Sequence, residues 1–249
     1  MKPASYGRLV FGAAAVLFGV IGFLWRDPDT WQSPTILKLP FVAAVTAILA
    51  LAQIAGGFGM FAPRTLRAAS IVLAAVYAIF SLACIPGILH HPAAYVAYGN
   101  FFEWFSLVCG ALAAFAATQT GARSLSIGRT ARIGMGLCLV SFTLAQLFYF
   151  QLTASLVPAW ILPNQAFWVV LTTIAFALAA IAVLVNVRAR LALQLTFAML
   201  TVFGLLVWVP AVAGHPEMHG NWSEFTLNFL IAGAVWTLAG VPADFRDAA

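Results

Sequence analysis

Long apolar stretches separated by short polar ones dominate this sequence. Eight stretches reach the length of about 20 apolar residues that a helix needs to cross the hydrocarbon of a bilayer. Such stretches are expected to be helical, because a helix satisfies its backbone polar groups internally where lipid offers no hydrogen bonds. The predicted segments are 8–25, 41–62, 68–89, 101–118, 133–152, 166–185, 191–212 and 222–241. The pattern predicts an all-α integral membrane protein with eight transmembrane helices.

Composition strengthens the membrane interpretation. Of the 249 residues, 63% are hydrophobic and only 8% are charged, whereas a soluble domain carries about 25% charged residues. The sequence pI of about 9.5 is also found in nucleic-acid-binding proteins. Here, however, the basic residues are scattered singly or in small groups between apolar runs and form no phosphate-binding patch. The expected partner is therefore the lipid bilayer and not nucleic acid.

The basic residues fall mainly on one side of the predicted helices. The other side has only Arg26 and Lys38. Cytoplasmic loops carry an excess of Lys and Arg, so both termini are expected in the cytoplasm. The basic side holds Lys2, Arg8, Arg64, Arg67, Arg123, Arg129, Arg132, Arg188, Arg190 and Arg246.

The two halves of the chain resemble each other when Arg8 is aligned with Arg132. The matches are Pro86 with Pro210, His91 with His215 and, after a three-residue shortening, Asn100 with Asn221 and Glu103 with Glu224. Each half holds four predicted helices, an even number, so both copies should have the same orientation in the membrane. We expect two parallel-oriented four-helix bundles, residues 1–118 and 132–249, joined by a cytoplasmic linker at 119–131.

The first half resembles the DoxX-like membrane proteins. Arg8 leads its first helix, the second ends in the glycine-rich and basic stretch AQIAGGFGMFAPRTLR, a His follows the third, and an Asn opens the fourth. The chain departs from the family at Gln53, where a glutamate is frequent, and the second half has lost both this residue and the glycines. The resemblance implies a bacterial-type inner (plasma) membrane protein with a quinone-linked or redox-accessory role beside a redox enzyme or membrane partner subunit.

The repeated Asn-x-x-Glu motif is the first candidate site. Asn100 with Glu103, and Asn221 with Glu224, have the spacing of a capping box, in which an acid also suits the positive end of the helix dipole. The alternative is a pair of carboxylates at the outer mouth of the bundles that hold a cation or pass a proton. Ser106 and Asn228 extend each motif into a short polar stripe along its helix. Gln53 in the second predicted helix is a further candidate for ligand or ion binding.

The histidines are the second candidate site. His91, His215, His219 and Glu217 lie on the predicted outer side and contain residue types that bind metals or haem. All four histidines of the chain sit in loops or at loop edges, which also suits solvated side chains or proton handling. Asp27 and Asp29 in the first outer loop suit either a solvated turn or cation binding.

No signature of a catalytic nucleophile, phosphate loop or metalloprotease is present. The leading hypothesis is a redox-accessory membrane subunit that binds a quinone or another small hydrophobic ligand. The second is a transporter or channel for a small solute or ion, with a path between the halves past Glu103 and Glu224. The third is a haem or metal protein that uses the outer histidines.

Overall fold

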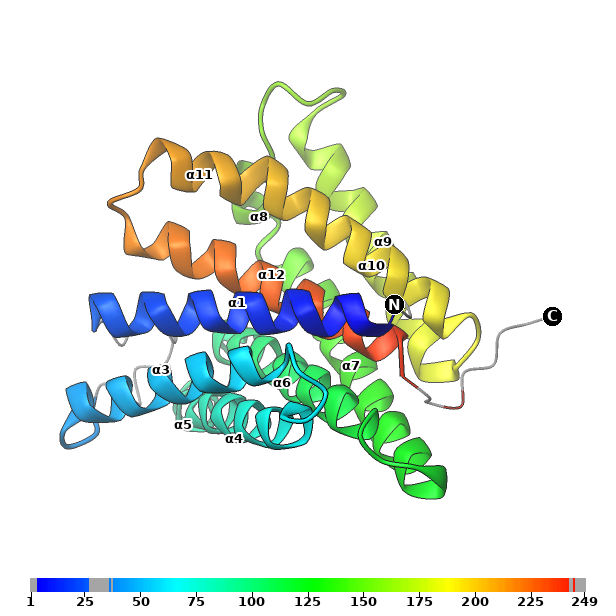
Figure 1. The fold of residues 1–249 in the computed structure, drawn as a ribbon. Coiled ribbons are helices and arrows are strands. Elements are labelled where there is room, and N and C mark those ends of the chain that lie inside the picture. Colours follow the sequence, from blue (N-terminus) through cyan, green and yellow to red (C-terminus); the bar gives the residue numbers. More distant parts are fainter. Residues whose placement is uncertain (1–3, 27–35, 37, 242–243, 245–249) are drawn as a thin grey trace.

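The computed structural model describes residues 4–26, 36, 38–241 and 244, so Lys2, Asp27, Asp29 and Arg246 lie outside the described part (Figure 1). Within that part the chain folds into helices and forms no β-strand. The helices are α1 Ala4–Trp25, α3 Val42–Gly59, α4 Leu66–Ala83, α5 Ile85–His90, α6 Tyr95–Ala116, α7 Gly121–Phe148, α8 Phe150–Leu156, α9 Gln165–Val185, α10 Ala189–Phe203, the π-helix η2 Gly204–Trp208, α11 Val209–Gly214 and α12 His219–Ala239.

Seven of the helical stretches are long and apolar enough to cross a membrane, which confirms a multi-pass helical architecture. The eighth predicted segment corresponds to α12, which has 21 residues but falls outside this set because of polar residues such as Glu224 and Asn228. Most of α12 from Ser223 onward is buried among other helices, so its surface does not need the hydrophobicity of a lipid-facing helix. The seven stretches are Tyr6–Trp25, Val42–Gly59, Leu66–His90, Tyr95–Ala116, Gly121–Phe148, Gln165–Val185 and Ala189–Gly214.

The long helices pack in a closed ring. Each of α1, α3, α4, α6, α7, α9, α10 and α12 packs against the next in this order, and α12 returns to pack along α1. In addition, α6 contacts α12 across the middle of the ring. Figure 1 shows α1 in front of α12 near the centre, with α3 and α4 on one side and α9 and α10 on the other. Because α6 and α12 meet, side chains from the two halves of the chain can reach a common space.

Small residues bring these central helices close together. A Cβ atom added to Gly110 of α6 would lie 2.4 Å from the Cβ of Ala234 in α12, and one added to Gly233 would lie 2.5 Å from the backbone nitrogen of Phe11 in α1. In lipid, where helices gain no hydrophobic energy from association, such small residues allow close van der Waals packing. The glycines therefore fix how near α6, α12 and α1 approach.

A cluster of large aromatic side chains fills the core of the first half. Trp104 of α6 and Tyr77 and Phe80 of α4 are fully buried, as is Phe18 of α1. The Trp104 ring lies 5.0 Å from the ring of Phe80 and 5.7 Å from that of Phe18, both edge to face. This geometry is favourable for aromatic pairs and leaves the space between α1, α4 and α6 closely packed.

The predicted helix boundaries are wrong in two places that affect the site. Helix α6 begins at Tyr95 and not near Phe101. Helix α7 begins at Gly121, so most of the segment predicted as the linker 119–131 is helical. Ser124 in that segment donates a hydrogen bond to the carbonyl of Ala116 at 2.8 Å, which fixes the start of α7 to the end of α6.

Replacing Gly110 by alanine tests the close approach of α6 and α12. The new methyl group would meet Ala234 at a distance that forces the helices apart. We expect the Gly110→Ala protein in detergent to lose about 1–3 kcal/mol of unfolding free energy, measured as a lower melting temperature. Gly99→Ala in the same helix is the matched control, because its Cβ would meet only a ring carbon of Tyr95 at 3.8 Å. Equal melting temperatures for the two variants would contradict this packing.

Candidate functional site

The two repeated glutamates lie inside their helices and not at the helix starts. Since α6 begins at Tyr95 and α12 begins at His219, Asn100 and Asn221 are helical residues and the residues at the caps are Ala94 and Met218. Neither cap residue makes a side-chain capping hydrogen bond. The capping-box interpretation is therefore wrong, and the dipole at the helix start does not account for Glu103 or Glu224.

Asn221 holds two helices together instead of capping one. Its Nδ2 donates to the carbonyl of Ala211 at 3.0 Å, which links the first turn of α12 to α11. Asn164 does cap a helix: its Oδ1 accepts from the backbone N–H of Phe167 at 2.9 Å at the start of α9. The Asn-x-x-Glu motif thus resembles a capping box in sequence but does not form one. The asparagine that does cap a helix, Asn164, has no glutamate three residues later.

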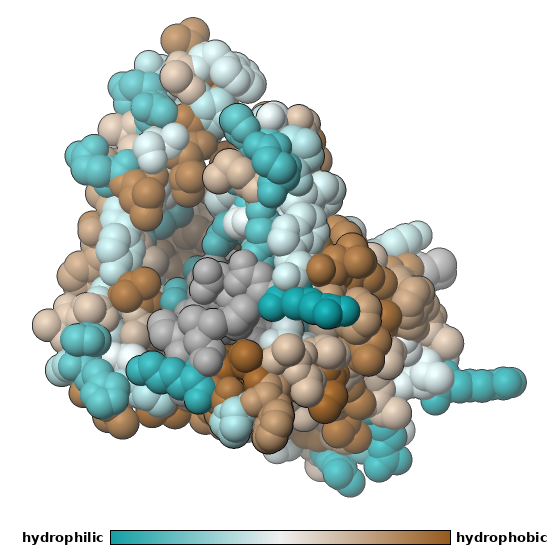
Figure 2. Space-filling view, turned by 90° about the vertical axis from the view of Figure 1, so that its left-hand side faces the viewer, coloured by the Kyte–Doolittle hydropathy of each residue, from teal (hydrophilic) through white to brown (hydrophobic). Residues whose placement is uncertain are grey.

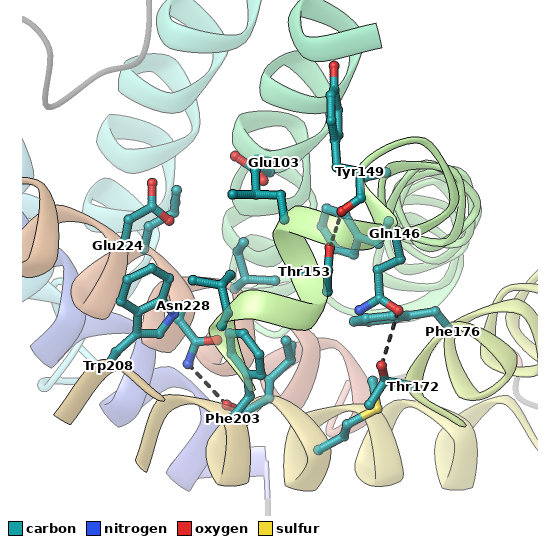
Figure 3. Close-up of a pocket in the computed structure, with 18 residues that line it drawn as sticks. Glu103, Gln146, Tyr149, Thr153, Thr172, Phe176, Phe203, Trp208, Glu224 and Asn228 are labelled. Atoms are coloured by element: carbon teal, nitrogen blue, oxygen red, sulfur yellow. Dashed lines mark hydrogen bonds between the residues drawn. The ribbon is translucent and has the colours of Figure 1, made fainter. Parts of the chain in front are cut away.

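A pocket of about 320 Å³ lies where α6, α7, α8, α9, α10 and α12 meet (Figure 3). Glu103 and Glu224 both line it, so one pocket brings together an acid from each half of the chain. The other lining residues are Phe142, Ala145, Gln146, Tyr149, Leu152, Thr153, Leu156, Thr172, Phe176, Met199, Leu200, Phe203, Trp208, Leu227, Asn228 and Ile231.

The walls of the pocket are mostly aromatic and aliphatic, with a few polar groups held in place. Thr172 and Thr173 of α9 donate to Oε1 of Gln146 in α7 at 3.1 and 2.8 Å. Asn228 of α12 donates through Nδ2 to the carbonyl of Leu200 in α10 at 3.0 Å. These bonds join facing helices across apolar surroundings, as is common in membrane proteins, and they fix the direction of both amides.

A local π-helix forms part of the pocket wall that follows α10. Residues Gly204–Trp208 widen the turn between α10 and α11, and Trp208 at its end lines the pocket. π-Helical turns are uncommon and are often found at functional sites. Here the wider turn follows Leu200, whose carbonyl accepts the hydrogen bond from Asn228.

The electrostatic character of the pocket is acidic. Glu103 and Glu224 are both partly buried, and their carboxylates lie near enough to interact electrostatically. None of the residues that line the pocket is Lys, Arg or His. Figure 3 shows the two glutamates toward one end of the pocket and the Gln146–Thr172 pair toward the other. The site therefore combines an acidic end with an apolar body and a neutral polar end.

Two other predicted site residues lie elsewhere. Ser106 is buried and its Oγ donates to the carbonyl of Glu103 in its own helix at 2.6 Å. Gln53 is buried in α3 against Gly19 of α1, and neither its amide nitrogen nor its amide oxygen has a hydrogen-bond partner among the described residues. Neither residue lines the pocket of Glu103 and Glu224.

The histidine candidates do not converge on one point. His215 pairs with Glu217 at 3.3 Å on the surface, with both side chains more than two thirds exposed. The ring of His219 stacks on that of Trp25 at 5.3 Å, and His91 is exposed. Figure 2 views this end of the molecule, where polar and apolar residues alternate. Among the described residues no group of three or more His, Cys, Asp or Glu side chains is placed to hold a metal ion.

Fold and site together define a multi-pass α-helical membrane protein with an acidic, aromatic-lined pocket among its helices. Compared with known proteins, the chain matches no family model, no curated protein and no solved structure.

Cysteines in place of the two glutamates test whether both side chains face one pocket. In a protein whose three native cysteines are replaced by alanine, we expect Glu103→Cys and Glu224→Cys to be joined by a short bis-methanethiosulfonate reagent. The link is detected by mass spectrometry of the proteolytic peptides. The control pair combines Glu103→Cys with Glu217→Cys, because Glu217 is exposed in the loop before α12. Equal linking of the two pairs would argue against a shared pocket.

Proposed function

We propose that this chain is a membrane protein that binds a small, largely apolar ligand in the pocket among α6, α7, α8, α9, α10 and α12. The observation that carries the proposal is the pocket, since a volume of about 320 Å³, aromatic walls and a few oriented polar groups are the usual features of a small-molecule site. The ring of a quinone is one ligand of this class. A role beside a redox enzyme or partner subunit is proposed on the resemblance to DoxX-like proteins alone.

We also propose that the chain has eight spans and is a tandem DoxX-like duplication. The packing of α12 along α1 supports an eighth span. Gly7 lies against the backbone of Thr237 at one end of the pair, and Trp25 stacks on His219 at the other. Helix α12 thus runs beside an apolar helix over its whole length. The order of contacts supports the duplication, because exchanging α1, α3, α4 and α6 with α7, α9, α10 and α12 leaves the ring of packed pairs unchanged.

The same duplication offers a reason for the pocket to lie in the second half. Aligning Arg8 with Arg132 places Gly204 at the position of Phe80, and the alignment of the two glutamates places Phe225 at the position of Trp104. In the first half Phe80 and Trp104 fill the core. The smaller residues of the second half leave room for a ligand.

Transport is the second candidate function. Glu103 comes from the first half and Glu224 from the second, and both reach the pocket. A solute path between the halves would pass these carboxylates, with the termini proposed on the cytoplasmic side by the distribution of basic residues. Uptake into proteoliposomes that is lost in both Glu103→Gln and Glu224→Gln would favour transport over binding alone.

Filling the pocket tests the binding proposal. Ala145 of α7 lines the pocket, so Ala145→Phe should occupy the space of the ligand. Leu144→Phe is the control, because the neighbouring side chain of Leu144 is 38% exposed on the outer face of the same helix. We expect small molecules that co-purify with the wild-type protein and with Leu144→Phe to be depleted at least about tenfold in Ala145→Phe, as measured by mass spectrometry of solvent extracts.

A titration with decylubiquinone, monitored by tryptophan fluorescence, provides a second measurement on the same variants. Binding should quench the fluorescence of the wild-type protein and of Leu144→Phe, since Trp208 lines the pocket. Identical extracts and identical titrations for the two phenylalanine variants would overturn the proposal of a ligand in this pocket.

A further inference from the structure

We infer that the ligand of this pocket is an organic cation, a protonated amine carried on an aromatic or aliphatic body. This inference rests on the proposed function of the pocket and specifies its ligand. It starts from the imbalance of charge. Two carboxylates, Glu103 and Glu224, line the pocket, and none of the lining residues is basic. Both carboxyl groups border a space whose walls are mostly apolar side chains.

The apolar surroundings strengthen the attraction of this end of the pocket for a positive charge. Charges interact more strongly in an apolar site than in water, because the effective dielectric constant is lower. Two neighbouring carboxylates also repel each other, and a cation between them relieves that repulsion. A positively charged group between them would interact favourably with both, so the acidic end of the pocket is complementary to a cation.

A third polar atom points to a hydrogen-bond donor on that cation. Asn228 lines the pocket one turn after Glu224, and its residue is 7% exposed. Its Nδ2 donates to Leu200, whereas its Oδ1 accepts no hydrogen bond from a described residue. This oxygen is not fully enclosed by the protein, so a molecule in the pocket can reach it. An ammonium N–H group would supply that donor, and an apolar ligand would not.

The rest of the pocket argues for an organic body. Calcium takes 6–8 oxygen ligands and magnesium requires a nearly ideal octahedron, and the described residues offer no group of three His, Cys, Asp or Glu side chains placed for a metal ion. Beyond the glutamates the lining is instead aromatic, with Phe142, Phe176 and Trp208. Aromatic faces attract cations and bury apolar surface. A compact inorganic ion would leave most of the 320 Å³ pocket without contacts.

The test compares two probes of nearly equal shape, 3-phenylpropylammonium and butylbenzene, which differ by an NH₃⁺ group in place of a CH₃ group. Binding to the purified protein in detergent is measured by equilibrium dialysis at pH 7. We expect the wild-type protein to bind the ammonium probe at least about tenfold more tightly than butylbenzene, since a paired charge in an apolar site contributes more than a methyl group. In Glu103→Gln and in Glu224→Gln, the ratio of the two affinities should fall to about one.

Glu217→Gln is the matched control, because Glu217 is an acid of the exposed loop before α12 and lies outside the pocket. It should retain the wild-type ratio, and melting temperatures of all variants should show that they are folded. The glutamine variants should still bind butylbenzene as the wild-type protein does, since only the charge is removed.

The possible results separate the two proposals. Equal binding of the probes, or tighter binding of butylbenzene, overturns the cation inference and leaves the apolar pocket in place. A preference for the ammonium probe that survives both glutamine substitutions also overturns it, because the charge selectivity would then come from elsewhere. Failure of both probes to bind, together with unchanged extracts from Ala145→Phe, overturns the proposed function itself.

Discussion

The close approach of α6 and α12 is the constraint on which the remaining structure depends. These helices meet where Gly110 lies against Ala234, and each belongs to a different half of the chain. Glu103 lies two helical turns before Gly110, on the same face of α6. The contact that joins the halves therefore also turns Glu103 toward the pocket that Glu224 lines. A wider separation of the helices would leave each carboxylate in its own half.

The two halves of the chain differ in how their interiors are filled. Around Trp104, the aromatic rings of Phe18, Tyr77 and Phe80 close the space between the helices. Around Asn228, a glycine and a π-helical turn in α10–α11 leave a pocket, and Trp208 stands at its edge. Close packing stabilises a helical protein, and an open pocket gives up part of that stability. The proposed ligand would restore the contacts that the second half lacks.

The sequence predicted the helices well because its signal is local. An apolar run of about 20 residues needs only its own composition to be recognised, and seven such runs are helices of the expected kind. The predicted cap at Asn100 is wrong because the motif is short and the preceding residues, Tyr95 to Gly99, also form part of the helix. Only the position of the preceding turn, set by packing, decides where that helix begins.

The pairing of Glu103 with Glu224 could be suspected from the repeated motif, whereas the remainder of the pocket could not. Gln146 and Thr172 are isolated polar residues in the sequence, and nothing local shows that they bond to each other across α7 and α9. Gln53 has the same appearance in the sequence but is enclosed without a partner among the described residues.

Gln146 and Gln53 are the same residue type and differ only in their surroundings. Gln53, Tyr77 and Trp104 keep polar atoms inside the filled half, where the described side chains provide them no hydrogen bond. In the second half, the carboxylates of Glu103 and Glu224 and the amides of Gln146 and Asn228 border a space that a molecule can occupy. Polar groups are costly in either setting, but only in the second can a ligand offset that cost. Ligand binding is therefore expected where buried polar groups line a cavity, and the selectivity for a ligand follows from the charge of those groups.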